Sequence, residues 1–153
     1  MPIDTVTISN MDSSDIPRVI EIEDMSFTHR WTLTAYVAEL SNPGSICRTA
    51  HLGGMVVGFI CVRIMVDEAH ILRLAVDPAH RRGHVGSLLV RYIIDEALKD
   101  FDGKIILEVR VSNISAARLY ESLGFKKSYV RRCYYNEPDE DAVVMAYDLS
   151  SRA

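Results

Sequence analysis

The stretch that decides the fold is residues 71–90, ILRLAVDPAHRRGHVGSLLV. Its first six residues alternate as a strand, and Asp77-Pro78 then predicts a turn. A basic, glycine-containing loop (residues 80–86) leads into a segment whose apolar residues recur at i, i+3, i+4, i+7 and i+8. This spacing predicts a helix with one buried face. The apolar residues of that face are Val85, Leu88, Leu89, Tyr92 and Ile93.

A strand that feeds a glycine-containing loop at a helix N-terminus favours an anion site. The first backbone N–H groups of a helix have no partner within it, and the helix dipole is positive there. Arg81 and Arg82 add charge where a phosphate would bind. Many α/β proteins carry such a turn without a ligand, so a purely structural loop stays open on this pattern alone. The loop has neither the Lys-Ser/Thr ending of a P-loop nor GxGxxG spacing.

The composition is that of a globular domain. The chain has 153 residues, of which 48% are hydrophobic and 25% charged, and we expect one domain over residues 1–153. The longest apolar run, residues 55–66, is interrupted by Gly58 and Arg63 and is too short to span a membrane. No basic-then-apolar N-terminal segment suggests a signal peptide. We therefore expect a cytoplasmic protein with no membrane partner.

The patterns of cysteine, histidine and charge argue against several other functions. Cys47, Cys61 and Cys133 are odd in number and far apart on strand-like stretches, which predicts buried, reduced and inert thiols. The five histidines show no metal-ligand spacing, so no metal is expected. The net charge of −4 does not favour nucleic-acid binding. We interpret the acidic residues within 21–24 and 137–141 as surface clusters, which would suit a basic partner if they flanked a site.

The remaining segments alternate between strands and helices. The helix after the loop is expected to end at Asp102-Gly103. Before the loop we expect a strand at 5–8, a helix from near Asp15 capped by Ser13 or Ser14, and a helix from Thr32 or Thr34 through Leu40. A hairpin of residues 46–51 and 55–66, which turns at Gly53-Gly54, follows them. After the loop and its helix we expect a strand at 104–111, a helix from Ser112-Asn113 through Leu123 closed by Gly124, and strands at 125–135 and 142–148. The order β-α-α-β-β-β-α-β-α-β-β predicts an α/β (α+β) fold, a mixed sheet with helices on both faces.

Two residues of the C-terminal half are candidates for acid–base chemistry. Glu108 lies in an apolar strand, where desolvation would raise its pKa toward the range useful for a general base. A structural ion pair with Arg110, on the same face, stays open as the alternative. Tyr120 shares a helix face with Asn113 and Ala117 at i, i+4, i+7 spacing. That face would offer an amide, a small residue and a phenol, although a core tyrosine is the alternative.

Three stretches together resemble the GCN5-related N-acetyltransferase (GNAT) family. The loop has its R/Q-x-x-G-x-G/A spacing after LAVDP, and residues 107–125 (LEVRVSNISAARLYESLGF) and 131–147 (RRCYYNEPDEDAVVMAY) are similar to its bacterial RimI-type subfamily. That subfamily acetylates the N-terminal amine of a ribosomal protein. The element order is also that of the family. The resemblance therefore spans nearly the whole chain and implies the GNAT fold, with a central mixed, mostly antiparallel twisted sheet of about seven strands.

The resemblance implies a role for each matching residue. Glu108 falls on the family's proton acceptor, Tyr120 on its proton donor and Asn113 on a side-chain contact to acetyl-CoA. The positions that would bind acetyl-CoA through the strand and the pyrophosphate loop are Leu74, Ala75, Val76, Arg81, Arg82, Gly83, His84, Val85, Gly86 and Ser87. Two aromatic residues, Trp31 and Tyr134, are expected to be walls of the groove for the acceptor peptide.

The chain departs from the family pattern at two places. His84 occupies the position of the loop's first motif glycine, with Gly83 just before it. The segment His29-Arg30-Trp31 takes the place of the usual aromatic-Pro-Trp turn. Each departure places an unusual side chain where a ligand is expected to approach, the cofactor at the first and the acceptor at the second.

Together these patterns predict an acetyl-CoA-dependent N-α-acetyltransferase for a protein N-terminus, with the N-terminal alanine of a ribosomal protein as the leading acceptor. The amine would attack directly in a ternary complex, without a metal. The expected partner is a basic ribosomal protein, with no direct nucleic-acid partner, and the enzyme is expected to be a monomer or weak dimer. Two alternatives stay open: the same chemistry on another N-terminus, a small amine or a polyamine, and a non-catalytic CoA-binding or interaction module.

Overall fold

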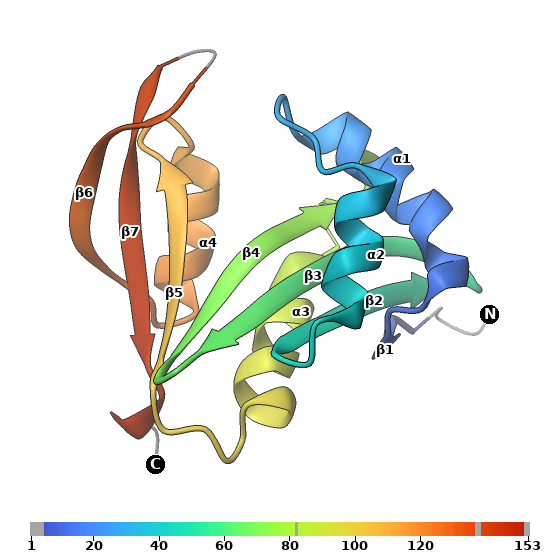
Figure 1. Ribbon diagram of the computed structural model, residues 1–153, viewed down its shortest axis with the longest axis horizontal. Helices are drawn as coiled ribbons and strands as arrows, with labels where there is room; N and C mark the ends of the chain where they lie inside the picture. Colours follow the sequence, from blue (N-terminus) through green and yellow to red (C-terminus); the bar gives the residue numbers. More distant parts are fainter. Residues whose placement is uncertain (1–4, 82, 137–138, 152–153) are drawn as a thin grey trace. The chain divides into compact units, whose positions relative to one another are not determined.

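The computed structural model describes residues 5–81, 83–136 and 139–151, and its elements follow the predicted order (Figure 1). The chain divides into two compact units. Unit 1 comprises Met1–Arg63 and Leu72–Lys99, and unit 2 comprises Ile64–Ile71 and Asp100–Ala153. The strands are β1 (Thr7–Asn10), β2 (Ser45–Leu52), β3 (Met55–Met65), β4 (Glu68–Val76), β5 (Lys104–Arg110), β6 (Lys126–Tyr135) and β7 (Glu140–Asp148). The helices are α1 (Ile16–Ser26), α2 (Leu33–Ser41), α3 (Val85–Tyr92) and α4 (Ile114–Ser122).

In the described part of the chain, the seven strands form a sheet in the order β1-β2-β3-β4-β5-β7-β6. β4 pairs with β5 in parallel, whereas β1 with β2, β2 with β3, β5 with β7, and β6 with β7 are antiparallel pairs. The strand β7 thus lies between β5 and β6, although it comes last in the sequence. The predicted mixed, mostly antiparallel sheet of about seven strands is confirmed.

In unit 1, helices cover both faces of the sheet, as predicted. Residues 56–62 of β3 are all buried, and alternate residues point to opposite faces of a strand. A Cβ placed on Gly58 would lie 3.0 Å from Val85 of α3, so this position faces α3. The ring of Phe59 packs instead edge-to-face against Tyr36 of α2, at 5.8 Å between centroids. α1 and α2 therefore cover one face and α3 covers the other (Figure 1).

Turn and cap residues set most of the boundaries in unit 1. Gly53 and Gly54 both have positive φ (59° and 79°), which is what the tight turn between β2 and β3 requires. Thr32 caps α2, and its hydroxyl accepts a hydrogen bond from Ala35 N, as predicted. The cap before α1 is different from the prediction, because Asp12 rather than Ser13 or Ser14 caps a single 3-10 turn that leads into the helix.

The end of the third helix was predicted wrongly. α3 ends at Tyr92 and is continued only by a π-helical segment, Ile93–Ala97, so Asp102-Gly103 does not terminate it. Gly103 has another role within unit 2. A Cβ at this position would overlap the carbonyl oxygen of Asp67, so only glycine lets the two backbone segments pass this closely.

Unit 2 is built on β5 and α4. Ile105, Leu107 and Val109 are buried, whereas the residues between them are only partly buried, so one face of β5 belongs to the core. The side chain of Asn113 caps α4 by accepting a hydrogen bond from Ala116 N at 3.2 Å. Gly124 follows the helix with φ of 104°, a conformation that favours glycine and confirms the predicted helix end.

Candidate active site

The end of β4 and the turn after it form a well-connected part of unit 1. Asp77 N donates to Val57 O at 2.8 Å, and the Asp77 carboxylate accepts a hydrogen bond from Ala79 N at 2.9 Å. The same carboxylate pairs with Arg18 of α1. The hydrogen bond from Ala79, followed by the Arg18 guanidinium, lowers the pKa of Asp77. Leu74, Ala75 and Val76, the predicted cofactor strand, therefore end at a turn that is tied to both β3 and α1.

The loop after this turn has the donors that an anionic group requires. Arg81 is exposed; its guanidinium donates to Val76 O at 3.2 Å and to Ser26 Oγ at 3.3 Å. Arg82, also predicted to contact the pyrophosphate, lies outside the described residues. Gly83 is exposed at the surface, and Gly86 and Ser87 occupy the first turn of α3, where backbone N–H groups lack helical partners. Exposed arginine and free helical N–H groups fit a phosphate-bearing cofactor.

His84, at the position of the family's motif glycine, has a left-handed backbone conformation. Its φ of 62° and ψ of 20° place it in the left-handed region, just before Val85, which is buried and anchors the start of α3. The His84 side chain is exposed and makes no capping hydrogen bond. A residue with a Cβ thus adopts a conformation that is unstrained mainly for glycine.

The predicted proton acceptor has an ion-pair partner that the sequence did not suggest. Glu108 lies on the partly buried face of β5, and its side chain is 19% exposed. Its carboxylate is 3.5 Å from Arg131 Nη1, on β6. Arg110, the partner considered from the sequence, instead pairs with Glu140 at 3.4 Å. Glu108 therefore remains partly accessible beside a guanidinium that is itself half exposed.

The other predicted acid–base residue, Tyr120, is buried on α4. Burial, followed by the nearby Tyr135, raises the pKa of the Tyr120 phenol. Its ring packs against Phe125 with 5.5 Å between centroids. Asn113 lies at the exposed start of the same helix, and Ala117 between them is half-buried. The face predicted from i, i+4, i+7 spacing therefore runs from solvent into the core of unit 2.

Near Glu108, two arginine–tyrosine pairs form a cluster that sequence analysis missed. Arg131 lies over the ring of Tyr134 and Arg110 over the ring of Tyr135, each at 4.3 Å. The two tyrosine rings meet edge-to-face at 5.0 Å. Burial is the main cause that raises the pKa of Tyr135, to about 12. Tyr134, a predicted substrate wall, is 41% exposed and is held beside the partner of Glu108.

The strand β6 is irregular at this cluster, which corrects one prediction. Cys133 has φ of 51°, and the register with β7 shifts between Arg131 and Tyr135. Cys133 N donates to the Asp141 carboxylate at 2.8 Å. This bulge leaves Cys133 exposed, so the prediction of a buried thiol is wrong there, whereas Cys47 and Cys61 are buried as predicted.

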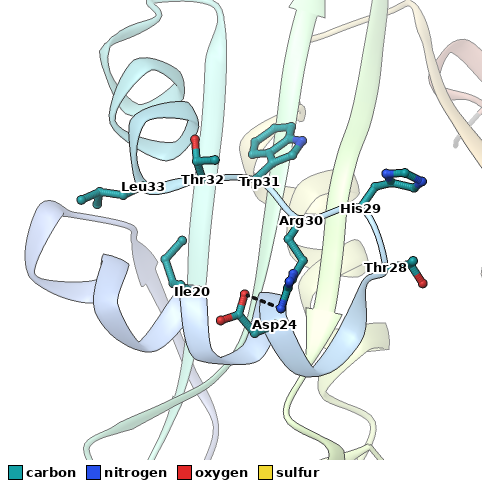
Figure 2. Close-up of a pocket in the computed structure, with 8 residues that line it drawn as sticks. All are labelled: Ile20, Asp24, Thr28, His29, Arg30, Trp31, Thr32 and Leu33. Atoms are coloured by element: carbon teal, nitrogen blue, oxygen red, sulfur yellow. Dashed lines mark ion pairs between the residues drawn. The ribbon is translucent and has the colours of Figure 1, made fainter.

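In unit 1, the loop between α1 and α2 (residues 27–32) lines a pocket of about 540 Å³ (Figure 2). Trp31, the predicted acceptor wall, belongs to this loop and packs against Tyr36 at 5.2 Å between ring centroids. Asp24 and Arg30 form an ion pair at 3.8 Å across part of the pocket. The pocket residues are Ile20, Asp24, Thr28, His29, Arg30, Trp31, Thr32 and Leu33.

Glu23, which was predicted to lie at the surface, is a buried charged residue that contacts this loop. Glu23 is fully buried, although it belongs to the acidic group at residues 21–24 that we interpreted as a surface cluster. Its carboxylate accepts hydrogen bonds from Trp31 N at 3.1 Å and from the Tyr36 hydroxyl, and it is 3.3 Å from Arg73. Helical spacing carried a signal: Glu23 follows buried Val19 by four residues and so falls on the apolar face of α1.

The described ranges contain neither a cluster of metal ligands nor a membrane-spanning helix. No group of three or more His, Cys, Asp or Glu side chains there could hold a metal ion. None of the helices described is long and apolar enough to cross a bilayer.

Comparisons with known proteins identify the class to which this fold and site belong. The model of the acetyltransferase (GNAT) family matches residues 16–125, and the chain therefore belongs to the GNAT family of N-acetyltransferases, as the resemblance predicted. It is 36% identical to the [ribosomal protein bS18]-alanine N-acetyltransferase of Escherichia coli K12, over 94% of this chain and 98% of that protein. The N-alpha-acetyltransferase RimI of Mycobacterium tuberculosis is 33% identical, over 94% and 92%.

A solved structure agrees with these relatives. The crystal structure of the ribosomal-protein-S18-alanine N-acetyltransferase from Escherichia coli superposes with a TM-score of 0.88 at 32% identity, and the match covers 97% of each chain. Both the family and the fold class predicted from the sequence are thus confirmed.

Proposed function

We propose that the protein is an acetyl-CoA-dependent N-α-acetyltransferase that modifies the N-terminal amine of a protein. A ribosomal protein with N-terminal alanine is the leading acceptor. The observation that carries this proposal is the 36% identity, over nearly the full length of both chains, to an enzyme named for acetylating the alanine of ribosomal protein bS18. Such an acceptor is basic, and the enzyme is cytoplasmic and acts as a monomer or weak dimer. Residues 1–153 act as one catalytic domain.

Unit 1 supplies the residues for the cofactor. Acetyl-CoA brings the acetyl group as a thioester, which an amine can attack without a metal. Leu74, Ala75 and Val76 bind its pantetheine arm along β4, and the pyrophosphate is bound at the start of α3. Arg81 is exposed beside that start, where a guanidinium can bind a phosphate in bidentate fashion. The loop residues assigned to the pyrophosphate are Arg82, Gly83, His84, Val85, Gly86 and Ser87.

Asn113 and Tyr120 of unit 2 serve the cofactor as well. The cap of α4 uses the side-chain oxygen of Asn113, so its NH₂ group is the part that donates to the cofactor. Tyr120 protonates the departing thiolate. Burial raises the pKa of its phenol, so the phenol is protonated at neutral pH but is a weaker acid than an exposed tyrosine. The thiol is already a fair leaving group, so this proton transfer contributes less than the removal of the amine proton.

Glu108 accepts the proton of the acceptor amine, directly or through one water molecule. An α-amine has a pKa near 8, so most of it is protonated and unreactive at neutral pH. The Glu108 carboxylate is partly exposed on β5 and lies 3.5 Å from Arg131, which fixes its position. Holding amine and thioester together supplies most of the acceleration, and proton removal adds roughly 10²–10⁴-fold.

Aromatic residues form the walls for the acceptor. Tyr134 is 41% exposed and is oriented by Arg131, the same residue that contacts Glu108. Trp31 lines the pocket of unit 1, in which the Asp24 carboxylate is paired with Arg30 (Figure 2). Large aromatic surfaces of this kind bury the first residues of a peptide without much loss of side-chain entropy.

The test is the kinetics of Glu108→Gln with a peptide acceptor. We expect kcat to fall roughly 10²–10⁴-fold while the Kd for acetyl-CoA stays near the wild-type value, because only proton removal is lost. Glu121→Gln is the matched control, since Glu121 is an exposed carboxylate of unit 2 that is 3.8 Å from Lys127 and has no assigned role. A Glu108→Gln enzyme that turns over at the wild-type rate would remove Glu108 from the mechanism.

A further inference from the structure

One arginine of β4 contacts the α1–α2 loop (residues 27–32) at several points. Arg73 Nη2 donates to His29 O at 2.8 Å. Its guanidinium lies 4.3 Å from the centre of the Phe27 ring and 5.1 Å from that of Trp31. The side chain is only 16% exposed. A single planar group from the sheet thus touches the backbone of the loop and two of its aromatic side chains.

The ion-pair partner of Arg73, Glu23, also contacts this loop. Glu23 is fully buried and lies 3.3 Å from Arg73 Nη2. Its carboxylate also accepts the N–H of Trp31 and the hydroxyl of Tyr36, which lies in the first turn of α2. Desolvation, followed by the hydrogen bond to Glu23, raises the pKa of Tyr36, so its hydroxyl remains a donor. A fully buried carboxylate needs such partners, because an uncompensated charge in the core is strongly unfavourable.

The loop needs this support because it is irregular chain between two helices. Its residues have backbone groups that neither helix can pair, and such groups require partners elsewhere. Arg73 satisfies His29 O and Glu23 satisfies Trp31 N. Both ends of the ion pair therefore stabilise the conformation of the same short segment.

Stability alone does not account for an arginine at this position. Within the described chain, Arg73 Nε is buried without a hydrogen-bond partner, which is unfavourable. Apolar residues of similar volume can often replace a buried ion pair without loss of stability. The directed contacts to Phe27, His29 and Trp31 are what an apolar side chain could not provide.

From these contacts we infer that Arg73 is a positioning residue, which holds the α1–α2 loop and its Trp31 in place to receive the acceptor peptide. The inference rests on the proposed function and deepens it. Arg73 directly precedes Leu74, the first of the strand residues assigned to acetyl-CoA. The acceptor loop is therefore fixed to the cofactor strand by one side chain. Without it, the acceptor must order the loop as it binds, which weakens binding.

The test is Arg73→Lys, which keeps the positive charge but loses the planar fork and the stacking on two rings. In the variant, the acceptor must immobilise the loop side chains as it binds. A free-energy cost of about 1.4 kcal/mol for this step corresponds to about a tenfold rise in KM for the acceptor peptide. KM for acetyl-CoA should change by less than about threefold, because the strand itself is not altered. Trp31 is the only tryptophan of the chain, so its fluorescence reports the loop directly. We expect stronger acrylamide quenching and a red shift of its emission.

Arg48→Lys is the matched control. Arg48 is also a partly buried arginine of unit 1, with a buried Nε that has no partner in the described chain, and it lies 5.8 Å from the ring centre of Tyr92 on α3. It should change neither Trp31 quenching nor the acceptor KM. A second variant, Tyr36→Phe, removes the hydroxyl donor to Glu23 and keeps the ring, and it should also increase Trp31 quenching.

The outcomes separate this inference from the proposed function. Wild-type quenching and wild-type acceptor KM in Arg73→Lys would overturn the inference, as would an equal rise of both KM values. If Arg73→Lys does not fold, Tyr36→Phe with unchanged quenching would overturn it. If the wild-type protein acetylates no peptide, the proposed function fails, whereas Trp31 fluorescence still decides whether Arg73 holds the loop.

Discussion

The backbone of His84 allows a prediction about stability. His84 has φ of 62° and ψ of 20°, and its side chain is exposed and makes no cap to α3. A residue with a Cβ in the left-handed region costs roughly 1–2 kcal/mol relative to glycine. Replacement by glycine removes this strain but increases the conformational entropy of the unfolded chain, which offsets about 0.4–1 kcal/mol. The net effect of His84→Gly is therefore a gain of about 0.5–1 kcal/mol in the free energy of unfolding.

The assay is thermal unfolding followed by circular dichroism. For a chain of this size, 1 kcal/mol moves Tm by about 2–4 °C, so His84→Gly should raise Tm by about 1–4 °C. His84→Ala is the control, since alanine keeps the Cβ and with it the strain, and its Tm should stay close to that of the wild type. A lower Tm in His84→Gly, or an equal rise in His84→Ala, would refute the argument from backbone strain.

Three further predictions use other features of the structure. Gly124→Ala should lower the free energy of unfolding by about 1–3 kcal/mol in urea titrations, because φ is 104° and the new Cβ would lie 2.9 Å from the Tyr147 ring. The lowered pKa of Asp77 contributes stability above about pH 4, and this contribution is lost as the pH falls through the folded-state pKa. Asp77→Asn should therefore flatten the decline of the urea midpoint below pH 4. Cys133, the exposed thiol, should react with a thiol reagent in the native protein, whereas Cys47 and Cys61 should react only after unfolding.

Local patterns were enough to predict most of the fold. Thr32 precedes a run with helical periodicity, so its hydroxyl was a candidate cap, and the structure confirms it. Gly53-Gly54 and Gly124 mark places where positive φ is required. These signals depend only on neighbouring residues, and the element order built from them is the observed one. The end of α3 had no comparable signal, because Gly103 is needed for close approach to Asp67 rather than to stop a helix.

For the candidate site, the sequence named residues and their expected roles but not the contacts between them. Glu108 and Tyr120 were identified by matching motifs, and their roles remain predictions. The Arg131 partner of Glu108 comes from another strand, and no spacing along the chain indicates it. Glu23 was assigned to the surface because acidic neighbours surround it in the sequence. Its burial depends on Arg73, which is far away in the chain and close only in the folded unit.

The central claim concerns the acceptor, and one measurement tests it most directly. Thiol release from acetyl-CoA is followed with peptides that begin with Ala, Ser or Met and with a peptide that begins with acetyl-Ala. The proposed function predicts release with free N-terminal alanine and none with the acetylated peptide, since only the former has an amine that can attack. Binding of acetyl-CoA without release on any of these peptides would contradict N-terminal acetylation.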